Sequence, residues 1–325
     1  MALLVVLGHC ISVIGSNDKL LWMVLIYIYS LHMPMFFVAA GYTLNIRRNL
    51  YQFINTKLKN IMIPYIEFAV IITLFQVLFK EYSYIDIISN IKANFLDIIL
   101  MTTKSRYASL WFLPTITFAL CISFVIEKYI RNKKWVIFIS VVLLLINQIW
   151  YLKGIESIWG IREALLAQFF ILMGYELKEN IREVFEKTNY SIMWTSALMW
   201  VYGITEWLRS KDCIISYWNT NIQPITWTIP LAASGITFFI ALVSVWKRYK
   251  GNIYKAFIYF GQISIYIYGF HYIFLRTIPR YVSENINCII RVLIITSSVL
   301  ILSLITTEIY LMFRFLLTSK NNRVV

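Results

Sequence analysis

Residues 20–44 read LLWMVLIYIYSLHMPMFFVAAGYTL, an apolar run without any Asp, Glu, Lys or Arg. The run exceeds the ~20 residues that a helix needs to cross the hydrocarbon core of a bilayer. Similar runs recur along all 325 residues, of which 60% are hydrophobic and only 14% charged, with a mean hydropathy of +0.69. This apolar share exceeds that of soluble domains, so we predict an all-α, polytopic integral membrane protein.

Runs near spanning length predict about ten transmembrane helices. They cover residues 1–15, 20–44, 62–80, 109–127, 135–152, 162–177, 190–208, 222–246, 257–278 and 288–317. The first is short for a span and the sixth is marginal. Because no internal repeat, low-complexity linker or soluble segment interrupts the series, residues 1–325 are predicted to form one membrane domain.

The net charge of +14 reflects basic residues that cluster in short segments between apolar runs. This distribution sets membrane topology and does not build a nucleic-acid groove, so nucleic acid is excluded as a partner. The segments between alternate runs are the more basic ones, which predicts that both termini lie in the cytoplasm. We expect the protein in the plasma or inner membrane. The four cysteines form no CxxC or Cys/His metal spacing and suggest neither a zinc site nor a disulfide framework.

All three histidines of the chain, His9, His32 and His271, fall within predicted spans. Ionisable residues in spans are rare and usually face the bundle interior. By helical rise, His9 and His271 lie at similar depth and His32 lies deeper, so the three would converge if helices 1, 2 and 9 are neighbours. A histidine suits general-base chemistry because its pKa lies near neutrality. A three-histidine metal site is the competing interpretation, although no Asp or Glu lies nearby in sequence to orient the ligands.

The longest outer connection covers residues 81–108 and contains IDIISNIKANFLDIIL. Its apolar residues recur at helical spacing with charges between them. This pattern predicts a short amphipathic helix on the outer membrane surface. A lid over an external acceptor site is the alternative.

Several segments together resemble the membrane-bound acyltransferase-3 family. IYSLHMPMFFVAAGY, residues 28–42, is similar to the family's His-Met-Pro-Leu-Phe-Phe signature, with Met35 in place of the leucine. LVVLGHC around His9 resembles the first-helix motif, SLWFLPTITF the fourth-helix motif, and FGQISIYIYGFHYIF a late Gly-x-x-Ser-x-x-Ile-Tyr-x-x-His pattern. Within the signature, Pro34 is expected to interrupt the helix hydrogen-bond ladder. The resemblance covers nearly the whole chain.

The resemblance implies an O-acyltransferase. Such a protein transfers an acetyl or similar group from acetyl-coenzyme A to a hydroxyl of a surface polysaccharide or its lipid-linked precursor. His9 takes the catalytic position, with His32 and His271 shaping or orienting the site, and no metal or permanently bound cofactor is expected. A polysaccharide exporter or flippase without acyl-transfer chemistry is the main alternative, and a polymerase of lipid-linked repeats is a third.

Lys57 and Lys59 stand where the family often has a pair of arginines, in FINTKLKNIMIPYI. We place them in a cytoplasmic loop, where they either set topology and contact lipid headgroups or bind the phosphates of acyl-coenzyme A. Glu67, one turn beyond Pro64-Tyr65, either pairs with a basic residue of this loop or orients a histidine.

The predicted acceptor contacts are Trp111, Arg106, Ser264, Tyr268 and, as a further alternative for that residue, Glu67. Trp111 is either an interfacial belt residue or a platform on which a sugar stacks. Tyr268 lies three residues before His271, on the same helix face, and could hydrogen-bond it. Gly8, Gly41 and Gly174 are expected to permit close helix packing.

The family usually carries an arginine eleven residues before the first-helix histidine. Counting back from His9 places that position at −2, before Met1, and the first apolar run is also short. Both observations lead us to expect a start codon assigned too late, with further residues, including this arginine, encoded upstream of Met1. A truncated gene product is the alternative.

Overall fold

The computed structural model describes residues 1–15, 17–78, 98–99, 110–187, 189–209, 214–216, 221–223, 225–247 and 251–321. Helices dominate this part of the chain, which confirms the all-α class. The one exception among the described residues is a short antiparallel pair of strands, β1 (Ile214–Ser216) and β2 (Asn221–Gln223). The described residues divide into two compact units, and the prediction of one membrane domain for the whole chain stays a prediction.

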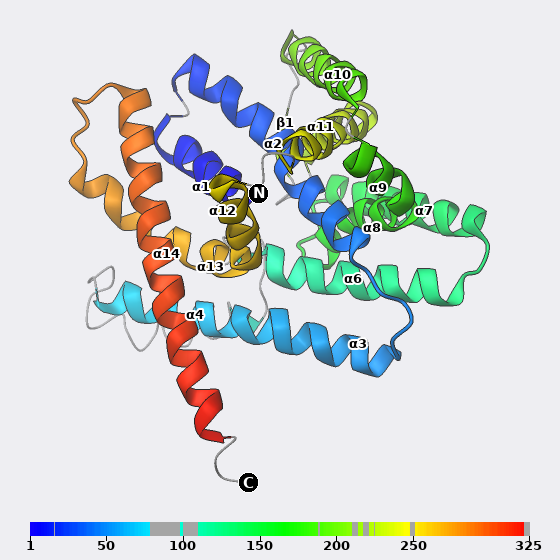
Figure 1. The fold of residues 1–325 in the computed structure, drawn as a ribbon, viewed down its shortest axis with the longest axis horizontal. Coiled ribbons are helices and arrows are strands. Elements are labelled where there is room, and N and C mark those ends of the chain that lie inside the picture. Colours follow the sequence, from blue (N-terminus) through cyan, green and yellow to red (C-terminus); the bar gives the residue numbers. More distant parts are fainter. Residues whose placement is uncertain are drawn as a thin grey trace. The chain divides into compact units, whose positions relative to one another are not determined.

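Unit 1 comprises residues 1–28 and 251–325. Its elements are α1 (Ala2–Cys10), the π-helical turn η1 (Ile11–Gly15), the first part of α2 (Lys19–Tyr42), α12 (Asn252–Gln262), α13 (Ser264–Thr277), the 3₁₀ turn η5 (Ile278–Tyr281) and α14 (Cys288–Asn321). α1 packs against α13 and α14, and α14 is the long helix that leads to the C-terminus in Figure 1. The shared core of these helices consists of Ala2, Val6, Cys10, Ile263, Ile267, Leu275, Ile295 and Val299.

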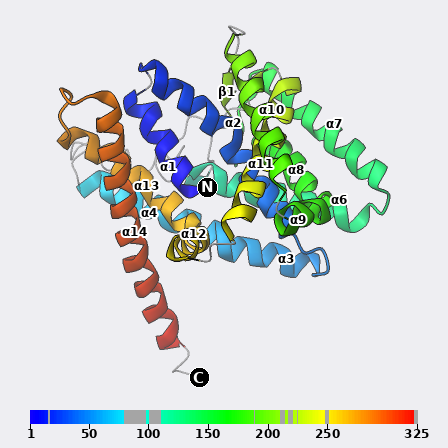
Figure 2. The same ribbon diagram turned by 45° about the horizontal axis from the view of Figure 1, so that its top comes forward.

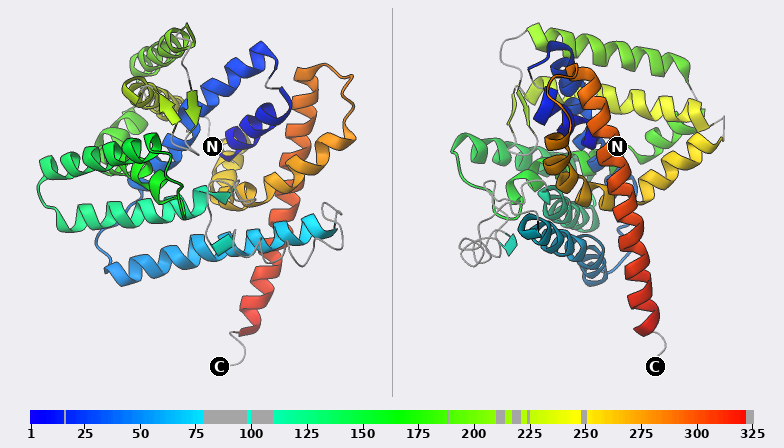
Figure 3. Two further views of the ribbon diagram at one scale, coloured as in Figure 1. Left: turned by 180° about the vertical axis from the view of Figure 1, so that it is seen from behind. Right: turned by 90° about the vertical axis from the view of Figure 1, so that its left-hand side faces the viewer.

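Unit 2 comprises residues 29–250. Besides the rest of α2 it contains α3 (Leu50–Lys57), η2 (Leu58–Met62), α4 (Ile63–Leu78), α6 (Phe112–Tyr129), α7 (Lys133–Leu152), α8 (Ile161–Glu176), α9 (Lys178–Lys187), α10 (Tyr190–Arg209) and α11 (Ile225–Trp246). α8 packs against both α6 and α7, as Figure 2 shows. α10 lies along α11, which can be followed in Figure 3.

Among the described residues, six helical segments are long and apolar enough to cross a membrane. They are Lys19–Tyr42, Leu50–Phe75, Phe112–Tyr129, Lys133–Leu152, Thr228–Trp246 and Cys288–Leu316. The other predicted spans coincide with shorter or less apolar helices, so the count of about ten stays a prediction. Many apolar side chains on the long helices are exposed, such as Ile137, Phe138 and Leu145 on α7. An apolar exterior of this kind suits contact with lipid.

Two predicted boundaries are wrong. The segment that carries Lys57 and Lys59 is not a loop, because Asn49 caps α3 and the chain then stays helical through η2 and α4. No Gly or Pro interrupts residues 50–63, and π-helical hydrogen bonds bridge the junction. The predicted span 257–278 is divided at Ile263, where the backbone leaves helical geometry between α12 and α13.

α2 and α8 approach each other at two glycines. A Cβ atom on Gly41 would lie 1.9 Å from the carbonyl oxygen of Ile171, and one on Gly174 would lie 2.2 Å from the carbonyl oxygen of Val38. The two backbones are therefore in direct contact, which only glycine permits at these positions. This confirms the predicted packing role of Gly41 and Gly174.

Pro34 does not end α2, which runs without interruption to Tyr42. Proline lacks the N–H group that would bond the carbonyl of Ser30, one turn earlier. At that turn the Ser30 hydroxyl accepts a hydrogen bond from Trp200 Nε1 of α10, at 3.1 Å. The neighbouring helix thus supports α2 where its own ladder is incomplete.

Candidate active site

His9 and His271 lie side by side in unit 1. Their ring centroids are 5.3 Å apart and the ring planes are inclined by 27°. α1 carries His9 and α13 carries His271, and these helices meet because Val6 and Cys10 share an apolar core with Ile267. The sequence left open whether the first and ninth predicted helices are neighbours, and the structure makes them so.

His271 has a defined orientation. Its Nδ1 atom lies 2.7 Å from the carbonyl oxygen of Tyr268. A carbonyl oxygen only accepts hydrogen bonds, so Nδ1 carries the hydrogen, and in the neutral ring Nε2 holds the lone pair. Nε2 is buried and has no hydrogen-bond partner among the described residues. The ring therefore presents a proton acceptor that no described protein group occupies.

The surroundings of the pair are apolar. The side chains of Cys10 and His271 are fully buried, and His9 is partly buried. Hydrogen bonds to a reacting group are stronger in such a medium than in water. Among the described residues, no group of three or more His, Cys, Asp or Glu lies close enough to hold a metal ion.

His32 belongs to the part of α2 in unit 2 and is described with that unit. Its side chain is buried, and its ring centroid lies 5.1 Å from that of Tyr29, one turn earlier. A role in shaping the site stays a prediction for this residue.

The other predicted site residues are distributed over both units. In unit 2, Lys57 is partly buried with Nζ 5.2 Å from the ring centroid of Phe53, whereas Lys59 is exposed on η2. Glu67 is partly buried on α4. In unit 1, Ser264 is the first residue of α13. The hydrogen bond expected between Tyr268 and His271 exists, and the tyrosine's backbone carbonyl makes it.

Trp111 is buried at the start of α6, with its ring edge-to-face against Phe112 at 6.3 Å. A belt residue needs a side chain exposed to lipid headgroups, so that interpretation is wrong. A stacking role requires one ring face to become accessible and stays a prediction. Arg106 lies outside the described residues, as does the predicted surface helix within 81–108 except for Ile98 and Ile99.

Comparison with protein families identifies the chain. The family model for acyltransferase family 3, described as an acyltransferase domain, matches residues 1–308. The chain belongs to acyltransferase family 3. Neither the curated proteins nor the solved structures give a match. Together with the apolar helices, membership in this family makes the protein a membrane acyltransferase.

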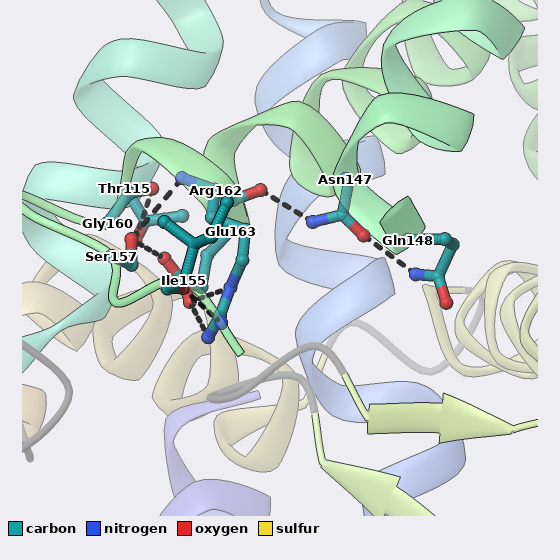
Figure 4. A network of polar contacts seen from close by, with 8 residues as sticks. All are labelled: Thr115, Asn147, Gln148, Ile155, Ser157, Gly160, Arg162 and Glu163. Atoms are coloured by element: carbon teal, nitrogen blue, oxygen red, sulfur yellow. Dashed lines mark hydrogen bonds and ion pairs between the residues drawn. The ribbon is translucent and has the colours of Figure 1, made fainter. Parts of the chain in front are cut away.

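The sequence reasoning missed a buried polar network at the start of α8 in this acyltransferase, shown in Figure 4. Arg162 Nη2 lies 2.7 Å from Glu163 Oε1, and both residues are buried. Arg162 also donates to the carbonyl oxygen of Ile155 at 3.2 Å, and the Ser157 hydroxyl donates to the second carboxylate oxygen of Glu163. Each buried charge therefore has an opposite charge and further hydrogen bonds, as burial requires.

The network joins α8 to its neighbours. Asn147 of α7 donates from Nδ2 to the carbonyl oxygen of Arg162 at 2.6 Å. Gly160 precedes α8 with φ of +65°, and a Cβ there would lie 2.1 Å from Thr115 Oγ1 of α6. A left-handed backbone without room for a side chain explains the glycine. The ends of α6, α7 and α8 are thus held together around two buried charges.

A sequence signal for this network existed. Arg162 and Glu163 are adjacent opposite charges at the beginning of the predicted span 162–177. The criterion that selected the histidines, an ionisable residue inside a span, applies equally to these two residues.

Proposed function

We propose that this membrane acyltransferase transfers an acetyl or similar acyl group from acyl-coenzyme A to a hydroxyl of a surface polysaccharide or its lipid-linked precursor. The proposed location is the plasma or inner membrane, with both termini in the cytoplasm. The observation that carries the proposal is the His9–His271 pair, two imidazoles in contact within an apolar core, one of which has a buried nitrogen without a described partner.

The chemistry needs a base where the acceptor hydroxyl attacks. In the proposed reaction the hydroxyl oxygen attacks the thioester carbonyl carbon, and His9 takes the hydroxyl proton. The carbon–sulfur bond then breaks, an ester forms, and the thiolate of coenzyme A leaves and takes up a proton. General-base catalysis of this kind contributes about 10²- to 10⁴-fold in rate. His271, fixed by its bond to the Tyr268 carbonyl, positions the reacting group beside His9.

The remaining predicted residues have supporting roles in this proposal. Lys57 and Lys59 contact phosphates of the donor, and His32 shapes the site. Contacts to the acceptor are assigned to Trp111, Arg106, Ser264, Tyr268 and Glu67.

The test replaces His9 by Ala and measures transfer of radiolabelled acetyl from acetyl-coenzyme A to polysaccharide isolated from a deletion strain. We expect the rate to fall at least about a hundredfold, since the base is lost, while the amount of protein in the membrane stays normal. Cys10→Ala is the matched control because it shortens the adjacent buried side chain of the same helix without touching the imidazole pair. It should keep most of the activity.

An undiminished rate in the His9→Ala protein would refute the assignment of the base. A deletion strain with normal glycan acetylation but reduced glycan export would instead favour the exporter. Short glycan chains in that strain would favour the polymerase.

A further inference from the structure

Unit 2 contains a cavity that none of the roles above uses. Its volume is about 710 Å³, within the range of small-molecule sites. It lies where the end of α2, the end of α6, the start of α7 and the junction of α8 and α9 meet. All of these chain segments belong to the side that the charge pattern predicts to be cytoplasmic.

Charged side chains of both signs line the cavity. The basic residues are Arg47, Arg131, Lys133 and Lys178, and the acidic residues are Glu127, Glu176 and Glu179. Two of the cations already have contacts: Lys133 pairs with Glu176 at 2.8 Å, and Lys178 Nζ lies 5.4 Å from the ring centroid of Tyr42. Neither the Arg47 nor the Arg131 guanidinium makes a hydrogen bond or ion pair with another described residue.

Helix termini do not account for these two arginines. Cations near helix C-termini often bond the last carbonyl oxygens. Neither arginine guanidinium makes such a bond among the described residues, whereas Lys128 Nζ donates to the carbonyl oxygens of Ile46 and Arg48 in the segment after α2. Arg47 and Arg131 thus remain available to a ligand.

The acidic side of the cavity also has an oxygen atom without a partner. The Glu127 carboxyl hydrogen-bonds that of Glu176, but its Oε1 atom is buried and has no hydrogen-bond partner among the described residues. An unpaired buried carboxylate oxygen is costly, and a ligand that donates an N–H group would satisfy it. The planar guanidinium groups match the oxygens of a phosphate.

We propose that this cavity binds a phosphate ester that also carries an amino group, with Arg47 and Arg131 on the phosphate and Glu127 on the amino group. Two ligands have this chemistry: the nucleotide end of coenzyme A, with phosphates and the adenine amine, and the headgroup of phosphatidylethanolamine. The first source rests on the proposed function, because it makes the cavity part of the donor site. The second source, the lipid headgroup, does not depend on the proposed function.

The test measures binding of coenzyme A to the purified protein by calorimetry at pH 7. The variant Arg47→Gln/Arg131→Gln removes both proposed phosphate contacts and should raise Kd for coenzyme A at least tenfold. The matched control, Arg182→Gln/Lys187→Gln, removes the same charge from α9 outside the cavity and should change Kd less than twofold. Those two side chains pair with Glu186 and Glu183 on the exposed surface of α9.

Each double variant removes two positive charges at pH 7. The hydrogen bond from Arg182 lowers the pKa of Glu186, so this carboxylate stays ionised at pH 7. The control therefore changes the net charge as the cavity variant does, and general attraction of an anion would affect both variants alike.

A second arm distinguishes the two ligand sources. Phosphatidylethanolamine that stays bound through purification is measured by native mass spectrometry for the same proteins. Loss of bound lipid with unchanged coenzyme A affinity assigns the cavity to the headgroup. If both ligands bind the cavity variant normally, or if both variants lose binding equally, the inference is overturned.

Glu127→Leu tests the amino-group contact. Wild-type protein should bind coenzyme A more tightly than the analogue in which the adenine amine is replaced by oxygen, and the variant should lose this preference. In the lipid arm, the variant should lose its preference for phosphatidylethanolamine over phosphatidylglycerol. A preference that persists for both ligands would remove Glu127 from the site.

The binding test of this cavity and the activity test of the proposed function can fail independently of each other. Acyl transfer by the Arg47→Gln/Arg131→Gln protein with a normal KM for acetyl-coenzyme A would overturn donor binding in the cavity while the proposed function stands. Tight, cavity-dependent binding of coenzyme A without any acyl transfer would overturn the proposed function while the cavity's role in coenzyme A binding stands.

Discussion

Arg162 and Glu163 are two opposite charges that neutralise each other in the interior of this protein. Each side chain is buried, and each charge is neutralised by its neighbour in the chain and by hydrogen bonds to Ser157 and the Ile155 carbonyl. Removing one partner of a buried pair leaves an uncompensated charge, which costs far more than removing both.

We therefore expect Glu163→Leu to destabilise the protein by about 3–5 kcal/mol, because Arg162 would remain buried without a counter-charge. The double variant Arg162→Met/Glu163→Leu should be more stable than this single variant, since apolar side chains then fill the space of both charges. Thermal unfolding in detergent, followed by tryptophan fluorescence, measures both. A double variant less stable than the single one would show that the network's other hydrogen bonds matter more than the charge pair.

At the scale of helices, the contact between α2 and α8 depends on the absence of two side chains. The Gly41 and Gly174 positions each face a backbone carbonyl of the opposite helix, which cannot move aside as a flexible side chain can. α2 also carries His32, so the same contact fixes the helix that holds the family's signature.

Gly174→Ala should destabilise the protein by about 1–3 kcal/mol, because the new methyl group would overlap the Val38 carbonyl and force the helices apart. Gly261→Ala on α12 is the matched control. A methyl group at Gly261 would meet no atom within 4 Å, and alanine favours a helix over glycine, so no loss of stability is expected. The measurement is the midpoint of thermal unfolding in detergent, which should be lower for Gly174→Ala than for Gly261→Ala. Equal midpoints would mean that α2 and α8 can separate without cost.

The division of the predicted span 257–278 also belongs to this scale. Residues around Ile263 are apolar and contain no proline, so composition alone favours one continuous helix. In the structure α12 buries none of its residues, whereas α13 contributes His271 and much of the unit 1 core. The chain changes direction where these two environments meet.

At the scale of the whole molecule, the distribution of basic segments predicts that both termini face the cytoplasm. A green fluorescent protein fused after the last residue should therefore fluoresce, and alkaline phosphatase fused there should be inactive. The matched control fuses each reporter after Lys153, in a segment predicted to face outward, and should give the opposite pattern. An active phosphatase at the C-terminus would reverse the orientation and place the cavity of unit 2 on the outer side.

The sequence by itself determined the membrane class, the helical fold of the described residues and the family. Hydropathy is a property of each segment alone, and the motifs around His9, His32 and His271 are contiguous in the chain. These features need no knowledge of which segments are neighbours. The positions of most helices follow for the same reason, except for the helical segment that begins at Leu50 and the division at Ile263.

Only the tertiary structure decided which residues meet. It placed His9 against His271, brought Gly41 and Gly174 into contact with opposite backbones, and formed the cavity beside Arg47 and Arg131. A span that is apolar on all sides has no amphipathic pattern to indicate its inward face. The partners of its few polar residues are therefore set by how the helices pack against one another, which the local sequence does not encode.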